Sequence, residues 1–400
     1  MEAFPGLRRA LRAAALAASL AACGAPAGQR DMTPAGAVSL EAAIADVEAG
    51  RQATPLIAAP TATGDATVTF LARRIDGRVP RVVSDVTGWG EHVDGTFDFG
   101  VGVMARVGQT EWYALQATVA PRARIEYQIA YAPGDYRLDP HNPRQSDGPR
   151  RKGARASEFV MPGYTPPPDL ADTPTVPHGR TTSAIVESRS DGGSWRVVTY
   201  LPPDYRAERT YPLAVFLDLR ADLLAPILDR MIARRAIPPI VAAFVGPVAF
   251  TGGHAAESTT RTFLVDELPA WMGARDGPGV GVGPRAILGI SFGAKDALDV
   301  ALASAESSHP FNGMGLLIPG RRIDRAAIDA LARRGGGRLH ATILAGRYDQ
   351  ANIATARGLR EALTTAGHRV DYIEVPEGHS AVTWSDHVPE VLASLFGHGG

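Results

Sequence analysis

Apolar and polar residues alternate in several short runs between about positions 65 and 162, and Gly, Pro and Asp separate the runs. The alternating runs occupy positions 66–71, 80–86, 111–119 and 124–130. A period of two is typical of strands that bury one face, and many short strands between turns are typical of two packed sheets. The pattern predicts a β-sandwich. We expect Trp89, Trp112 and Tyr113 to fill its core or its edge, the alternative being a carbohydrate-stacking face.

The pattern changes after a proline-rich stretch at 164–177, which is typical of a stiff linker. Strand-like apolar runs at 211–218, 285–289, 340–345 and 370–375 then alternate with helix-like runs at 294–302 and 353–363. This alternation predicts a mostly parallel sheet with helices on both faces. The expected organisation is therefore an all-β sandwich at 51–165, a linker at 166–180 and an α/β domain at 181–400.

The first 23 residues have the layout of a targeting segment. Three arginines precede an Ala/Leu run that is too short to span a bilayer and ends in Leu20-Ala-Ala-Cys23. This ending resembles the bacterial lipoprotein cleavage box, which implies a lipid on Cys23, a bacterial cell-envelope location facing the periplasm or the exterior, and the membrane as a partner. A plain secretory signal with an incidental cysteine is the alternative. Residues 24–50 are expected to form a tether and a short helical lead-in.

Composition narrows the function classes. The chain has 400 residues, of which 45% are hydrophobic and 21% charged, as in an ordinary globular protein of two domains. A formal net charge of −1 gives no overall field for nucleic acid, and the basic run Arg150-Arg151-Lys152 is expected in a solvated loop. Cys23 is the single cysteine, so the mature monomer has no disulfide and no thiolate metal site. His254 and Glu257 are too isolated to predict a metal site.

A candidate nucleophile follows the run at 285–289. There the sequence Gly289-Ile-Ser291-Phe-Gly293 leads directly into a helix-like segment. A strand–turn–helix of the form Gly-x-Ser-x-Gly is typical of the nucleophile elbow, which holds a serine hydroxyl clear of the backbone where a base can reach it. An ordinary glycine-rich turn is the alternative, since the chain contains 43 glycines.

A candidate acid and a candidate base follow in the order Ser, Asp, His that α/β-hydrolases use. Asp349 comes after the strand-like run at 340–345, and His379 lies in a glycine turn after the run at 370–375. In this interpretation His379 is the general base and Asp349 orients it. Asp371 and Glu377 are rival acids. Asp349 is also placed to cap the helix at 353–363, and Ser258 and Ser380 are rival nucleophiles.

These residues carry a family resemblance. From about residue 180 onward the chain resembles the α/β-hydrolase esterase family (the esterase D type) that includes enterochelin esterases, feruloyl and acetylxylan esterases and mycolyltransferases. The matching stretches are 200–205 with 211–218, the elbow at 289–293, and Gly378-His379-Ser380 with Trp384. Residues 51–165 resemble the immunoglobulin-like domain of enterochelin-esterase-type proteins at 54–57, 68–71, 139–143 and 160–162.

The resemblance implies a serine esterase that needs no cofactor and no metal, with the backbone amides of Phe292 and Leu219 as its oxyanion hole. The sequence departs from the family pattern in two places. The family usually has glycine after the Asp that ends its third strand, whereas Leu219 and Arg220 follow Asp218 here. The family's Arg-x-x-Glu-Leu stretch is absent. The expected partner is a small-molecule or glycan-linked ester, such as a siderophore trilactone, and not nucleic acid. Alternatives are a feruloyl or acetyl polysaccharide esterase, an envelope acyltransferase and a degenerate binding lipoprotein.

Overall fold

The computed structural model describes residues 39–62, 64–90, 98–151, 154–170, 176–190, 192–247, 261–320, 323–334 and 338–397. The targeting segment with Cys23, the pair His254 and Glu257, and the rival nucleophile Ser258 lie outside these residues. The predictions made for them therefore stay predictions. Arg150 and Arg151 close a strand, so the expected loop at this basic run is wrong for these two residues.

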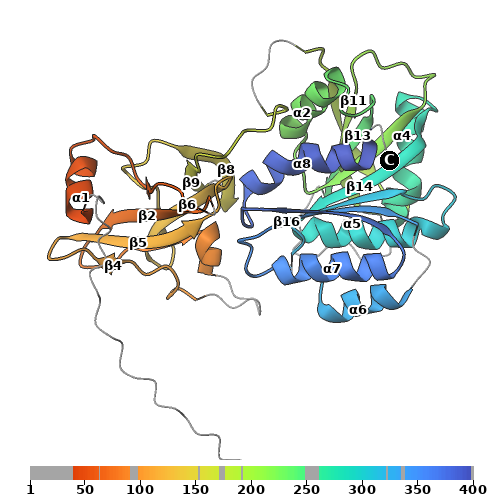
Figure 1. The fold of residues 1–400 in the computed structure, drawn as a ribbon. Helices are drawn as coiled ribbons and strands as arrows, with labels where there is room; N and C mark the ends of the chain where they lie inside the picture. Colours follow the sequence, from red (N-terminus) through yellow and green to blue (C-terminus); the bar gives the residue numbers. More distant parts are fainter. Residues whose placement is uncertain are drawn as a thin grey trace, which may run out of the picture.

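Two antiparallel sheets form the N-terminal part of the described chain, at the left of Figure 1. One has the strand order β1-β2-β5-β4 and the other β3-β6-β9-β8, with β7 beside β6. The strands are β1 (Leu56–Ile57), β2 (Ala66–Arg73), β3 (Arg81–Ser84), β4 (Ala105–Arg106), β5 (Trp112–Val119), β6 (Arg124–Ala132), β7 (Asp135–Arg137), β8 (Gln145–Arg151) and β9 (Ala154–Val160). Each of the four alternating runs contains an observed strand, because one face of each run is apolar.

The two sheets bury a shared core of alternate side chains, among them Phe70 on β2, Ile125 and Tyr127 on β6, and Phe159 on β9. The predicted sandwich is therefore confirmed. Trp112 and Tyr113 are 3% and 8% exposed, as expected for core aromatics. Helix α1 (Leu40–Glu48) packs its apolar face against Trp112, and its first turn is capped by the hydroxyl of Ser39.

An eight-stranded sheet dominates the rest of the described chain. Its order is β10-β11-β13-β12-β14-β15-β16-β17, with antiparallel pairing up to β13 and parallel pairing from there on. The strands are β10 (Arg180–Glu187), β11 (Ser194–Leu201), β12 (Tyr211–Leu217), β13 (Val241–Pro247), β14 (Val280–Ile290), β15 (Gly313–Leu317), β16 (His340–Gly346) and β17 (Arg369–Val375). The predicted mostly parallel sheet is confirmed, and this strand order is that of an α/β-hydrolase.

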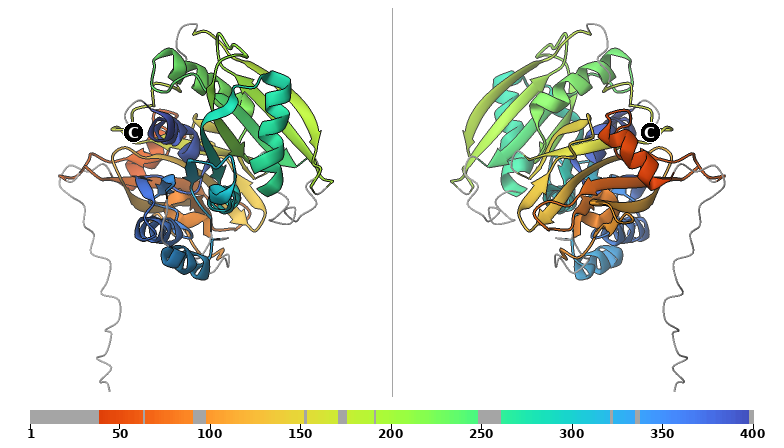
Figure 2. Two further views of the ribbon diagram at one scale, coloured as in Figure 1. Left: turned by 90° about the vertical axis from the view of Figure 1, so that its right-hand side faces the viewer. Right: turned by 90° about the vertical axis from the view of Figure 1, so that its left-hand side faces the viewer.

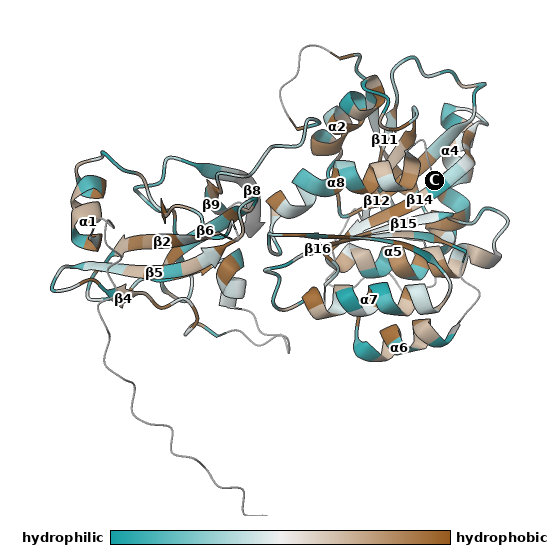
Figure 3. Ribbon diagram, viewed as in Figure 1, coloured by the Kyte–Doolittle hydropathy of each residue, from teal (hydrophilic) through white to brown (hydrophobic). Residues whose placement is uncertain are grey.

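Helices cover both faces of this sheet (Figures 1 and 2). Apolar residues of α2 (Ala221–Ala233) and α8 (Ala381–Phe396) pack on one face, and those of α4 (Leu268–Asp276), α5 (Phe292–Ala303), α6 (Arg325–Arg334) and α7 (Ile353–Thr365) on the other. Short helical turns, η1 (Asp85–Gly90), η2 (Phe263–Glu267) and η3 (Ser304–Glu306), complete the described elements. Figure 3 shows the apolar sides of the helices turned to the sheet and the polar sides turned outward. No helix among the described residues combines the length and apolar character needed to cross a bilayer.

The two parts meet at the carboxyl ends of β16 and β17 (Figure 1). Arg124 on β6 pairs with Asp386 on α8 at 2.8 Å, and the hydroxyl of Tyr164 donates to the same carboxylate at 2.5 Å. The carboxyl ends of parallel strands are where α/β sheets carry their ligand sites. The N-terminal sandwich therefore lies against the edge of the sheet where a site is expected.

Candidate active site

Ser291 occupies the sharp turn between β14 and α5. Its φ is 52° and its ψ is −108°, an unusual conformation for a residue with a side chain. A methyl group on Gly289 would overlap the carbonyl oxygen of Gly293, and one on Gly293 would lie 3.0 Å from a carboxylate oxygen of Asp218. The two glycines thus let the strand, the turn and the neighbouring loop approach closely. The turn has the geometry of a nucleophile elbow, with Ser291 at its apex.

A chain of hydrogen bonds links Ser291 to the two other residues predicted for the site. Ser291 Oγ lies 2.9 Å from His379 Nε2, and His379 Nδ1 lies 2.7 Å from Asp349 Oδ2. Asp349 is 6% exposed, whereas Ser291 and His379 are half-buried. The structure brings together three residues that lie 88 and 30 positions apart along the chain.

Asn352, which the sequence interpretation missed, holds the outer oxygen of Asp349. Its Nδ2 donates to Asp349 Oδ1 at 2.8 Å and lies 3.4 Å from His379 Nδ1. Asn352 is also the residue before α7, so the capping position belongs to Asn352 and not to Asp349. The available signal was an asparagine three residues after the predicted acid and immediately before a helix.

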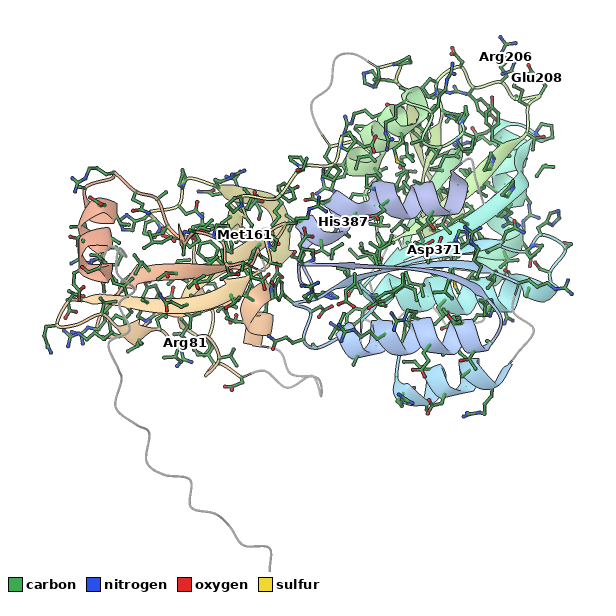
Figure 4. The ribbon with its side chains drawn as sticks, in the orientation of Figure 1. Arg81, Met161, Arg206, Glu208, Asp371 and His387 are labelled. Atoms are coloured by element: carbon green, nitrogen blue, oxygen red, sulfur yellow. The ribbon has the colours of Figure 1, made fainter. Side chains whose placement is uncertain are left out.

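The two rival acids lie elsewhere. Asp371 contacts His340 Nε2 at 2.8 Å and the hydroxyl of Ser394 at 2.7 Å, and Figure 4 shows it away from the N-terminal sheets. Glu377 turns toward α8, where its Oε2 lies 3.4 Å from His387 Nε2. Burial raises the pKa of Glu377. For His387, burial acts to lower the pKa, but the nearby carboxylates of Glu377 and Glu390 outweigh it and raise the pKa to about 9.

The rival serine Ser380 is also committed to another contact. It is 2% exposed, and its hydroxyl lies 3.0 Å from that of Thr383 in the first turn of α8. A buried hydroxyl held in this way has no access to a substrate. Among the described serines that the sequence singled out, Ser291 is the one whose hydroxyl lies within hydrogen-bonding distance of a histidine nitrogen.

The predicted oxyanion donors come from two neighbouring elements. Phe292 is the first residue of α5, and Leu219 follows β12, which pairs in parallel with β14. The chain turns at Asp218, whose φ is 59°. Its carboxylate approaches Gly293, so this turn lies directly against the elbow. Phe292 is 48% exposed, whereas the side chain of Leu219 is 7% exposed and packs into the core beside α2.

A cavity of about 570 Å³ opens beside this turn. Its walls include the apolar side chains of Val198, Leu219 and Phe244, and two arginines, Arg196 and Arg220, stand among its polar residues. Its volume suits a small organic group. Within the described parts of the chain, no group of three His, Cys, Asp or Glu side chains is arranged to hold a metal ion.

Of the two places expected for Trp89, the core of the sandwich or its edge, the structure shows the edge, in the turn directly after β3. Trp89 is half-buried, has a φ of 57°, and its indole nitrogen donates to Asp85 Oδ1 at 2.8 Å. Asp85 in turn lies against Gly378, the residue before His379. Trp89 therefore supports the contact between the two parts of the molecule through Asp85, which a pattern of alternating residues does not reveal.

Solved structures provide the comparison with known proteins. The ferric enterobactin esterase of Salmonella typhimurium matches with a TM-score of 0.64 and 20% identity, over 85% of this chain and 96% of that one. The enterobactin esterase of Shigella flexneri, crystallised in the presence of enterobactin, matches with a TM-score of 0.65 and 19% identity, over 86% and 96%. This chain has the fold of the enterobactin esterases. The likeness covers the N-terminal sheets as well as the α/β domain.

Other matches are weaker. A feruloyl esterase module from Clostridium thermocellum gives a TM-score of 0.46 and 14% identity, over 59% of this chain and 96% of that one. No protein-family profile matches the sequence, and no curated protein matches it. The comparisons thus establish the two-part fold and a structural likeness to esterases.

Proposed function

We propose that this protein is a serine carboxylic-ester hydrolase. The observation that carries the proposal is the hydrogen-bonded chain from Ser291 Oγ through the imidazole of His379 to Asp349, with the serine at the apex of an elbow. A serine hydroxyl becomes nucleophilic when a base of this kind accepts its proton. The likeness in fold to enterobactin esterases supports the same class of reaction.

In the first half-reaction, Ser291 Oγ attacks the ester carbonyl carbon while its proton passes to His379 Nε2. Asp349 stabilises the imidazolium that results, and the amides of Phe292 and Leu219 donate to the oxyanion. The carbon–oxygen bond to the alcohol then breaks, and the alcohol leaves with the proton from His379. The acyl group remains on Ser291.

The second half-reaction repeats these steps with water. His379 takes a proton from the water as its oxygen attacks the acyl carbon, and the same amides hold the oxyanion. Collapse of this intermediate returns the proton from His379 to Ser291 Oγ and releases the carboxylic acid. Each step uses side chains and backbone of this chain, and atoms balance without a cofactor.

Labelling with a fluorophosphonate tests the proposal, because the reagent reacts with an activated serine. We expect the wild-type protein to be labelled at Ser291 and to hydrolyse p-nitrophenyl acetate, and Ser291→Ala to lose both properties while keeping its circular dichroism spectrum. Ser380→Ala is the matched control and should retain both. A Ser291→Ala protein that keeps more than about one per cent of the activity would place the nucleophile elsewhere.

For the substrate, we propose a siderophore trilactone or a related ester. The support is that the likeness to enterobactin esterases extends over both parts of the molecule. The test compares kcat/KM for a catecholate trilactone, a feruloyl ester and an acetylated sugar, with product analysis in the presence of a free sugar to detect acyl transfer. A preference for either of the latter two esters would reject the trilactone while leaving the hydrolase mechanism in place.

We also propose that Cys23 carries a lipid that holds the enzyme on a membrane of the bacterial cell envelope. The support is the sequence Leu20-Ala-Ala-Cys23 after a short apolar run. Stable anchoring requires two or more acyl chains, since a single one binds marginally. Mass spectrometry of the N-terminal peptide and detergent-phase partitioning test this proposal.

A further inference from the structure

The loop that carries Asp349 is held by the N-terminal sandwich on both sides of the acid. On one side, the ring of Tyr348 packs against the sandwich core, and its Oη accepts a hydrogen bond from the backbone amide of Ala120 at 3.0 Å. On the other side, Gln350 lies against Gly88 of η1, where an added methyl group would come within 3.1 Å of Gln350 Oε1. The two residues that flank Asp349 in sequence therefore both contact the sandwich.

The loop that carries His379 is held by the same short helical turn of the sandwich. Asp85, the first residue of η1, is fully buried. Its side chain lies so close to Gly378 that a methyl group on this glycine would come within 2.7 Å of Asp85 Cβ. Asp85 is itself fixed, because Oδ1 accepts from the indole of Trp89 at 2.8 Å and Oδ2 faces the amide of Glu126 at 3.4 Å.

The two loops are also tied to each other. The amide of Tyr348 donates to the carbonyl of Glu377 at 2.8 Å, and the amide of Arg347 donates to that of Val375 at 2.8 Å. Gly346 allows this approach, since a methyl group there would lie 2.6 Å from the carbonyl oxygen of Gly378. A displacement of either loop is therefore transmitted to the other, and with it to the distance between His379 and Asp349.

We propose that the N-terminal sandwich is part of the catalytic unit. In this proposal, Asp85 of the sandwich and Tyr348 of the α/β part are positioning residues for His379 and Asp349. Asp85 acts through Gly378 on the imidazole of His379, and Tyr348 acts through the adjoining backbone on Asp349. Acyl transfer depends on such positions to within about 0.5 Å, and a misplacement of about 1 Å costs on the order of 10²-fold in rate. This inference rests on the proposed ester hydrolase function.

A pair of matched variants separates positioning from docking of the two parts. Tyr348→Phe and Tyr164→Phe each remove one hydrogen bond across the same contact, but Tyr164 bonds to Asp386 on α8 and not to a residue of the two loops. We expect Tyr348→Phe to lower kcat for p-nitrophenyl acetate about 5- to 20-fold with KM unchanged, in line with the loss of one buried hydrogen bond. Tyr164→Phe should change kcat less than about twofold, although both variants lower the midpoint of thermal unfolding.

Asp85 supplies the second test. Asp85→Asn keeps the volume and an oxygen for Trp89, so we expect it to retain kcat within about 5-fold, whereas Asp85→Ala should lose about 10²-fold. A readout independent of turnover is the far-downfield proton resonance of the His379–Asp349 hydrogen bond. We expect it to shift or broaden in Tyr348→Phe and Asp85→Ala and to stay in place in Tyr164→Phe.

The outcomes distinguish the two ideas. A wild-type protein that neither hydrolyses esters nor reacts with a fluorophosphonate would overturn the proposed function, and the inference with it. An active wild type whose kcat and proton resonance are the same in Tyr348→Phe as in Tyr164→Phe would overturn the inference alone. If Asp85→Ala does not fold, the comparison of Tyr348→Phe with Tyr164→Phe still decides the question.

Discussion

Replacing Asp349 by asparagine tests how the imidazole of His379 is oriented. In the wild-type protein, Asp349 Oδ2 accepts from His379 Nδ1 at 2.7 Å and Oδ1 accepts from Asn352 Nδ2 at 2.8 Å. An asparagine side chain has only one oxygen. Because Asn352 donates toward the outer position, the amide oxygen of the new residue should turn there and leave its NH2 group facing His379 Nδ1.

This arrangement gives the imidazole the wrong tautomer. His379 Nδ1 must then accept a hydrogen bond, so the proton moves to Nε2, which faces Ser291 Oγ at 2.9 Å and can no longer take the serine proton. We expect kcat to fall by roughly 10²–10⁴, which corresponds to about 2.7–5.4 kcal/mol of transition-state stabilisation. The thermal unfolding midpoint should change little, since asparagine and aspartate have nearly the same shape.

Adding Asn352→Ala to Asp349→Asn tests the reason for the loss. Without the outer donor, the amide can turn its oxygen toward His379 Nδ1, so the double variant should recover part of the activity that Asp349→Asn loses. Steady-state turnover of p-nitrophenyl acetate and single-turnover acylation provide the measurement, with Glu377→Gln as the control for the rival acid. Near-normal activity in Asp349→Asn together with a large loss in Glu377→Gln would refute the assignment, and a double variant no faster than Asp349→Asn would refute the tautomer argument.

Three further predictions concern the elbow, the buried pair and the anchor. Gly289→Ala should abolish turnover and lower the free energy of unfolding by about 1–3 kcal/mol, because the added methyl group overlaps backbone atoms. The control is Gly273→Ala on α4, where the methyl group meets open space and should raise the free energy of unfolding by up to about 1 kcal/mol. Thermal unfolding measures both. His387→Gln should lower the midpoint of thermal unfolding most below pH 6.5, and the difference from the wild type should disappear as pH rises through 9. The reason is that the pKa of His387 is raised from 6.5 to about 9 in the folded protein. A difference in midpoint that does not depend on pH would contradict the ion pair with Glu377. Cys23→Ser should move the protein to the aqueous phase without lowering kcat, and unchanged partitioning into detergent would refute the lipid anchor.

The sequence was sufficient wherever the signal is local. Strands β16 and β17 and helix α7 were predicted to within two residues at each end. Strand β16 is a continuous apolar run, β17 is rich in β-branched and aromatic residues, and the intervening helix ends near a glycine. The elbow was predicted for the same reason: its two glycines and serine form one turn. When the order of the strands is known, such local signals also predict which loops lie close together, since the carboxyl ends of neighbouring parallel strands lie at the same edge of the sheet.

The contacts between the two parts of the molecule carry no local signal. Ala120 and Tyr348 are 228 positions apart, and nothing around either residue distinguishes a buried hydroxyl at a domain contact from one on a surface loop. Trp89 shows the same difficulty, since an aromatic residue near a strand is equally consistent with a core position and with a docking contact. The residues that support the candidate acid and base therefore became visible only in three dimensions.

Leu219 illustrates why the likeness to enterobactin esterases supports a reaction class more strongly than a particular substrate. The resembling family usually has glycine at this position, and only the backbone amide is needed to hold an oxyanion, so the reaction class tolerates the change. The side chain of Leu219, however, forms part of the wall of the 570 Å³ cavity beside the elbow. This side chain is 7% exposed and packs into the core beside α2, so it presents a small apolar surface to the cavity and leaves the backbone amide at the turn. Because fold likeness does not fix side chains, we expect the choice of ester to depend on residues such as Leu219, Arg196 and Arg220, whereas the proposed chemistry depends on the elbow and the hydrogen-bonded chain behind it.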